Sequence, residues 1–186
     1  MMENEWLIRS NINVDSLRSC IEDAEKKDIF AMGINDRSTT GQNSKQWDFT
    51  KFDLLANYIT KKLLDEIYPF NIREYKSGNA WMVEGGEGSY HRLHRHVRPE
   101  QVRINPKERP HNKNIAVVCY LDVPPMPCGE FYFLLKKDND IEINAIENLK
   151  PGDMFVFPST VYHGVYPQGP GKRTTVNIDY DYAGKD

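Results

Sequence analysis

The segment from Ile115 to Val123 is a nearly continuous apolar run that ends at two prolines, Pro124 and Pro125. A short apolar run that is rich in β-branched residues and stopped by proline is typical of a strand buried on both faces. Such a strand needs a packed layer on each side. This requirement limits the fold more than any other feature of the sequence.

The residues around this run also favour strands. From about Asn71 onward, short runs of β-branched and aromatic residues are separated by Gly, Pro, Asn and Asp, which is the pattern of an antiparallel β-structure. Further strands are expected at Glu130 to Leu135, Asp140 to Ile146, Met154 to Phe157 and Thr174 to Tyr182.

The first third of the chain has a different periodicity. Apolar residues recur at helical spacing over Val14 to Ala24 and over Phe52 to Ile67, and Thr50 with Asp53 resembles a capping box for the second helix. The turn-forming stretch Asp36 to Gln46 predicts a loop between them. We therefore predict one domain over residues 1–186, of class α+β and mainly β. Residues 1–70 would be a mainly helical support, and residues 71–186 a sandwich or barrel core.

Composition excludes several classes of protein. The net charge is only -3, and no stretch approaches the roughly 20 apolar residues of a membrane helix. The N-terminus has no secretory signal pattern, so we expect a cytoplasmic protein with no membrane partner. The odd number of cysteines, without a CxxC pair, argues against a disulfide framework. There is no clear footprint for nucleic acid. The local basic cluster of Arg92, Arg95, Arg98 and Arg103 is either a solvated loop or a grip on an anionic substrate.

The segment GSYHRLHRH contains the first candidate metal ligands. His94 and His96 are two residues apart in a strand-like stretch, so both side chains are expected on one face. A second segment, PGDMFVFPSTVYHG, leads through a Gly-Asp turn and an aromatic run to His163. Three imidazoles on one face suit iron and leave positions open for substrate and oxygen. Tyr90 and Arg92 share the parity of His94 and could line the same cleft.

A candidate anion receptor follows His163. If the turn PQGPGK closes a hairpin, Arg173 lies opposite His163 on the neighbouring strand. A buried arginine beside a metal needs an anion, and its planar fork matches a carboxylate. Thr175 shares the strand face of Arg173 and can donate a further hydrogen bond. The pattern predicts a receptor for a dicarboxylate whose other end reaches the metal.

Four stretches in order, GSYHRLHRH, VCYLDVPPMPCGEFYF, LKPGDMFVFPSTVYHGVYP and GKRTTVNIDY, resemble the core of the 2-oxoglutarate- and Fe(II)-dependent oxygenases. The likeness is to the prolyl-hydroxylase-like branch and its small bacterial and phage relatives. It implies a double-stranded β-helix (jelly roll), Fe(II) and 2-oxoglutarate as cofactors, molecular oxygen as co-substrate, and hydroxylation with release of succinate and CO2. It also implies that His94 and His163 bind the metal and that Arg173 and Tyr120 bind the distal carboxylate of 2-oxoglutarate.

One position departs from that family. The family has Asp or Glu two residues after the first histidine, where this chain has His96. We expect His96 to bind as a third imidazole. The alternatives are that Glu100 or Glu130 folds in as the carboxylate, or that the position is vacant, with an exogenous ligand on the iron and His96 behind the metal ligands.

Two other functions fit part of the pattern. Gly88, His94, His96 and Glu100 resemble the first motif of the cupins, whose three-histidine dioxygenases and isomerases use no 2-oxoglutarate. A jelly roll without a metal could instead be a binding module. Arg173 favours the oxygenase, because neither alternative requires it. The substrate, a small molecule or a peptidyl side chain, is not predicted. The polar insert of residues 97–114 is the expected lid and the place to look for specificity.

Overall fold

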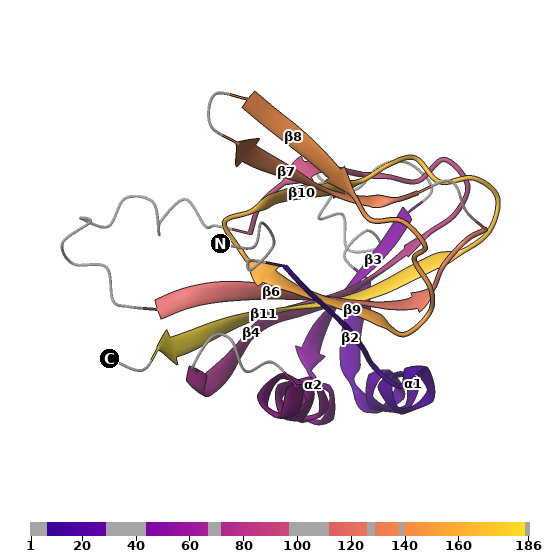
Figure 1. Cartoon of the computed structure of the whole chain (residues 1–186). Coiled ribbons are helices and arrows are strands. Elements are labelled where there is room, and N and C mark those ends of the chain that lie inside the picture. Colours follow the sequence, from indigo (N-terminus) through magenta and orange to yellow (C-terminus); the bar gives the residue numbers. More distant parts are fainter. Residues whose placement is uncertain are drawn as a thin grey trace.

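The computed structural model describes residues 7–28, 44–66, 72–96, 112–125, 129–137 and 140–184. Two antiparallel sheets face each other, and two helices cover the outer face of the larger sheet (Figure 1). The predicted class, α+β with a double-stranded β-helix core, is confirmed.

The larger sheet has seven strands in the order β1, β9, β6, β11, β4, β3, β2. Their bounds are Ile8–Asn11 (β1), Asp153–Pro158 (β9), Asn112–Asp122 (β6), Arg173–Gly184 (β11), Ile72–Gly85 (β4), Ser44–Lys51 (β3) and Glu25–Asp28 (β2). The smaller sheet has the order β5, β10, β7, β8. Its strands are His91–His94 (β5), Tyr162–Val165 (β10), Phe131–Lys137 (β7) and Asp140–Ala145 (β8). The C-terminal strands predicted from the sequence are confirmed.

Strand β6 shows why the run from Ile115 is apolar on both faces. Alternate residues such as Val117 and Cys119 pack in the core between the larger sheet and the helices. The residues between them, Val118 and Tyr120, pack between the two sheets. Each side chain from Ile115 to Leu121 is therefore buried in one of two cores, as the sequence predicted.

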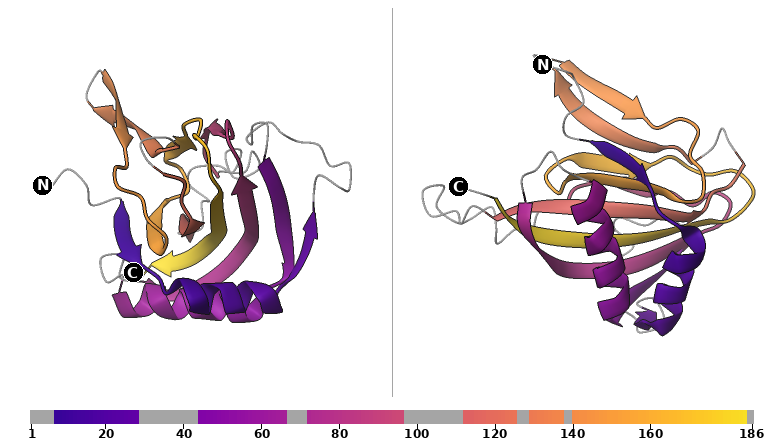
Figure 2. Two further views of the ribbon diagram at one scale, coloured as in Figure 1. Left: turned by 90° about the vertical axis from the view of Figure 1, so that its right-hand side faces the viewer. Right: turned by 60° about the horizontal axis from the view of Figure 1, so that its bottom comes forward.

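The two helices lie side by side beneath the larger sheet (Figure 2). They are α1, Val14–Asp23, and α2, Asp53–Glu66, in agreement with the helical periodicity. Their buried residues, including Leu17 and Ile59, join the same core as alternate residues of β6 and β11. Neither helix of the described ranges is long and apolar enough to cross a membrane.

The first third of the chain is less helical than predicted, because it also supplies β1, β2 and β3. Strand β1 pairs with β9, and β3 pairs with β4, so these strands extend the larger sheet at both edges. The capping box at Thr50 is wrong for the same reason. Thr50 belongs to β3, and its hydroxyl donates to the carbonyl of Glu25 on β2 at 3.4 Å. Of the predicted loop, residues 44–46 begin β3 and the others lie outside the described residues.

Two adjacent leucines of α2 provide a matched test of this packing. Leu63 is fully buried, whereas Leu64 is 51% exposed. Leu63→Ala should lower the free energy of unfolding by about 2–5 kcal/mol, because it removes buried methyl groups and leaves a cavity. Leu64→Ala should change it by no more than about 0.5 kcal/mol. Urea denaturation of both variants tests the assignment, and equal losses would contradict it.

Candidate metal centre and anion pocket

Three histidine side chains meet between the two sheets. One ring nitrogen from each of His94, His96 and His163 lies within 4.8 Å of the others. His94 ends β5 and pairs directly with His163 on β10, with 4.4 Å between the ring centroids. His96 lies just beyond β5, where its backbone N–H donates to the carbonyl of Ser159 at 3.0 Å. The three predicted metal ligands are thus brought together.

Hydrogen bonds select the same tautomer for all three rings. Nδ1 of His94 lies 2.7 Å from the carbonyl of Arg92, and Nδ1 of His163 lies 3.0 Å from the carbonyl of Val161. Nδ1 of His96 lies 2.7 Å from a carboxylate oxygen of Asp179. Because these oxygens only accept, each Nδ1 carries the proton, and the lone pair of each Nε2 can bind a metal.

Burial keeps the imidazoles of His94 and His163 neutral. It lowers the pKa of His94 to about 4, and the positive charge that a protonated His96 would carry acts in the same direction. Burial also lowers the pKa of His163 well below its usual value, and His94 and His96 add to the effect. Neutral imidazole is the form that binds metals, so His94 and His163 are ready for ligation at pH 7.

Arg173 reaches the same site by a route that the sequence did not predict. The expected hairpin is wrong, because β10 belongs to the smaller sheet and β11 pairs with β4 and β6 in the larger one. The connection carries Gln168, which is buried. Its backbone exchanges hydrogen bonds with Gly88 and Ser89, and its side-chain amide donates to the carbonyls of Gly85 and Gly171. These bonds hold the connection against the end of β4 as it crosses between the sheets.

Arg173 therefore faces the histidines across the sandwich. One pocket is lined by the three histidines and by Trp81, His91, Val118, Tyr120, Phe131, Val165, Arg173, Thr175 and Asn177. Thr175 shares the pocket face with Arg173, as parity predicted, and Tyr120 is its partner on β6.

The pocket contains buried polar atoms without partners. Arg173 is 2% exposed, and neither Nη1 nor Nη2 has a hydrogen-bond partner among the described residues. The same holds for the hydroxyl of Tyr120 and for Nε2 of His91. Burial lowers the pKa of Arg173 and raises that of Tyr120, so Tyr120 stays protonated and can donate. Leaving such groups unpaired is costly, and an anion that accepts from them fits the pocket.

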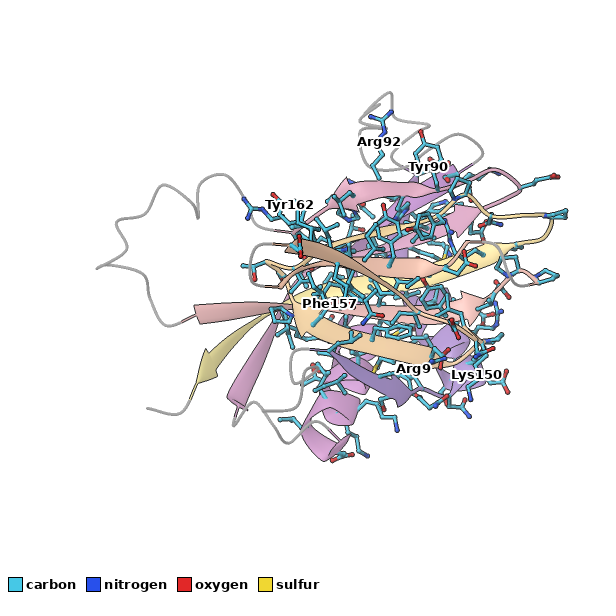
Figure 3. All side chains as sticks on the ribbon, turned by 45° about the horizontal axis from the view of Figure 1, so that its top comes forward. Arg9, Tyr90, Arg92, Lys150, Phe157 and Tyr162 are labelled. Carbon is cyan, nitrogen blue, oxygen red and sulfur yellow. The ribbon has the colours of Figure 1, made fainter. Side chains whose placement is uncertain are left out.

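Tyr90 and Arg92, which were expected to line the cleft with His94, are not among the residues that line this pocket. Four residues of β5, from His91 to His94, oppose only three of β10, from His163 to Val165, so β5 contains a bulge. The extra residue breaks the alternation of faces and brings His91 into the pocket, while Arg92 is exposed. Figure 3 shows Arg92 directed away from the layer between the sheets.

Neither Glu100 nor Glu130, the alternative carboxylate ligands, is found beside the histidines among the described residues. Glu100 lies outside the described residues, as does most of the insert of residues 97–114. Glu130 is not among the residues that line the pocket. The carboxylate found beside the histidines is Asp179, which sequence reasoning missed. Strand parity could have found it, because Asp179 continues the face of Arg173, Thr175 and Asn177 along β11.

No family model matches the sequence, and no curated protein matches it. Solved structures do match. A viral collagen prolyl hydroxylase from Paramecium Bursaria Chlorella virus-1, in complex with 2OG, is 16% identical with a TM-score of 0.62, covering 97% of this chain and 98% of that one. A prolyl-4-hydroxylase from Pseudomonas putida is 13% identical with a TM-score of 0.57, covering 98% and 95%. HygX from Streptomyces hygroscopicus, with nickel and 2-oxoglutarate bound, is 11% identical with a TM-score of 0.61, covering 94% and 82%.

The chain has the fold of the 2-oxoglutarate- and iron-dependent oxygenases. The likeness extends over nearly the whole chain and includes the N-terminal helices and strands, whereas the sequence resemblance began only near residue 79.

The lowered histidine pKa values predict acid sensitivity of the metal-free protein. Below pH 6.5 the unfolded chain takes up protons that folded His94, with its pKa of about 4, does not. The free energy of unfolding should therefore fall as the pH is lowered, by roughly 1 kcal/mol at pH 5.5 for this histidine. Urea denaturation at pH 7.5 and 5.5 measures the loss. His94→Asn cannot be protonated and should lose less; an equal loss would contradict the assignment.

Proposed function

We propose that this protein is an Fe(II)- and 2-oxoglutarate-dependent dioxygenase that hydroxylates a small-molecule or peptidyl substrate. One observation carries the proposal. The guanidinium group of Arg173, with both terminal nitrogens unpaired, is buried in the same pocket as three imidazoles that each present Nε2. The fold and the 2-oxoglutarate and nickel bound in similar structures support it.

The donor set fits iron. Imidazole suits Fe, Ni and Zn, and oxygenases of this kind hold Fe(II) on one face with open positions opposite. We assign the metal to Nε2 of His94, His96 and His163. Phe157 packs edge-on against the ring of His163, with 4.8 Å between the ring centroids. Trp81 packs against the ring of His96, with 5.3 Å between the centroids. These aromatic contacts restrict the ligand rings and exclude water from one side of the site.

The pocket also fits the distal carboxylate of 2-oxoglutarate. The fork of Arg173 can donate two parallel hydrogen bonds to a carboxylate, and the hydroxyls of Tyr120 and Thr175 can add others. We add His91 to this set, because its buried Nε2 is unpaired among the described residues. A three-histidine site of cupin type does not require a buried arginine, so the presence of Arg173 favours the oxygenase.

Together, Fe(II) and 2-oxoglutarate would supply the oxidative decarboxylation that turns molecular oxygen into a hydroxylating oxidant, with release of succinate and CO2. The protein's own residues bind and orient. Arg173 fixes one end of the co-substrate, and the imidazoles fix the other through the metal. Val118, Phe131 and Val165 also line the pocket, and their apolar side chains strengthen each charged contact there.

The substrate class stays broad in this proposal. Among the similar structures, HygX is described with hygromycin B bound, and a prolyl hydroxylase from Trichoplax adhaerens is described with a peptide fragment. Both a small molecule and a peptidyl side chain are therefore compatible with the fold.

Anaerobic titration of 2-oxoglutarate into the Fe(II)-loaded protein tests the cofactor assignment. We expect a weak visible charge-transfer band that saturates with the keto acid. His94→Ala should abolish the band, because it removes a metal ligand. A wild-type protein that binds iron in a His94-dependent manner but gives no band would contradict the role of 2-oxoglutarate and favour the three-histidine cupin type.

Arg173→Ala tests the anion pocket separately. We expect 2-oxoglutarate affinity to fall at least about 30-fold, the effect of losing about 2 kcal/mol from a buried charged pair, with metal content unchanged. The 2-oxoglutarate affinity of Arg173→Lys should lie between those of the wild type and Arg173→Ala, because lysine keeps the positive charge but lacks the planar fork of the guanidinium group. Arg92→Ala, which removes an exposed arginine outside the pocket, is the control. Unchanged affinity in Arg173→Ala would disprove the assignment of Arg173.

A further inference from the structure

The three histidines differ in what holds them. His94 and His163 each donate Nδ1–H to a backbone carbonyl two residues earlier in the chain. His96 instead donates to the carboxylate of Asp179, at 2.7 Å, and Asp179 lies on β11 in the opposite sheet. The His96 side chain is 7% exposed and that of Asp179 is 25% exposed. Of the three histidines, His96 is therefore the one whose Nδ1–H donates to a charged acceptor.

The charge of the site gives this contact a function. Three neutral imidazoles leave the full charge of a divalent metal uncompensated, whereas two histidines and a carboxylate are the usual donors for iron in oxygenases. A carboxylate that accepts from the far nitrogen of a ligating imidazole makes that imidazole a stronger donor and fixes its orientation. Asp179 supplies a negative charge one ring away from the metal position.

Among the described residues, the other contacts of His96 are a backbone hydrogen bond and ring contacts with Trp81, His94 and His163, which do not distinguish one ring nitrogen from the other. The carbonyl of Ser159 accepts from the backbone N–H of His96 and so fixes the backbone, and Trp81 contacts the ring only by its edge. Asp179 is the hydrogen-bond partner that determines which nitrogen of His96 faces His94 and His163. Its contribution is thus specific to the tautomer and rotation that ligation requires.

We infer that Asp179 is a positioning residue of the metal centre, and that it supplies through His96 the negative charge that a carboxylate ligand would supply directly. The inference rests on the proposed metal site. It assigns no role in binding 2-oxoglutarate or the substrate, so it can be tested with the metal alone.

Titration of Co(II) into the metal-free protein, read from its visible absorption, measures the effect. Asp179→Asn keeps an oxygen that can accept from Nδ1–H but removes the charge, and we expect about tenfold weaker binding; Asp179→Ala removes both, and we expect about 100-fold. Asp122→Asn is the matched control, because Asp122 is 29% exposed and is also held in an ion pair, with Arg18 at 2.6 Å. It should bind Co(II) as the wild type does.

The reduction potential of the iron-loaded protein distinguishes positioning from simple structural support. Loss of the negative charge in Asp179→Asn should raise the Fe(III)/Fe(II) potential, because the oxidised metal depends more on nearby negative charge. A potential and a Co(II) affinity that both match the wild type would overturn the inference. If His94→Ala still abolishes Co(II) binding in that case, the metal centre stands without Asp179. If wild-type binding does not depend on His94, the metal site and the inference both fall.

Discussion

Strand β11 contacts the hydrophobic core with one face and the polar pocket with the other, and the rest of the structure depends on this strand. It lies between β4 and β6 in the larger sheet. One face carries Val176, Ile178 and Tyr180 into the core between the larger sheet and the helices. The other face carries Arg173, Thr175 and Asn177 into the pocket. The alternation of strand side chains thus gives one element both its anchor and its chemistry.

The polar face of β11 is tolerated in part because a residue from the opposite sheet pairs with it. Buried charges are unfavourable unless they are paired. Asp179 pairs with His96 from the segment that follows β5, whereas Arg173 has no partner among the described residues. The site is consequently asymmetric, with the three imidazoles and a carboxylate near one end and a buried cation with nearby hydroxyls near the other. A dicarboxylate chelating a metal is complementary to this arrangement.

Particular residues show how far sequence reasoning extended. His94, His96, His163, Arg173 and Thr175 were predicted to meet, and they do. The reason given for Arg173 was nevertheless wrong, since the turn around Gln168 crosses between sheets and does not close a hairpin. The bulge in β5 places His91, and not Arg92, among the residues that line the pocket. Because strands from residues 8–51 complete the same sheet as the C-terminal strands, we propose that the chain forms a single domain.

The sequence alone specified the two helices, the C-terminal strands and the chemical type of the site, because period-2 and period-3.6 patterns and the clustering of histidines before and after the apolar run are local properties of the chain. Three features follow from the three-dimensional packing alone: the sheet that each strand joins, the position of the bulge that shifts the facing residues, and the contact of Asp179 with His96. These depend on hydrogen bonds and packing between residues far apart in the chain, 83 positions in the case of His96 and Asp179, and local patterns do not specify such contacts.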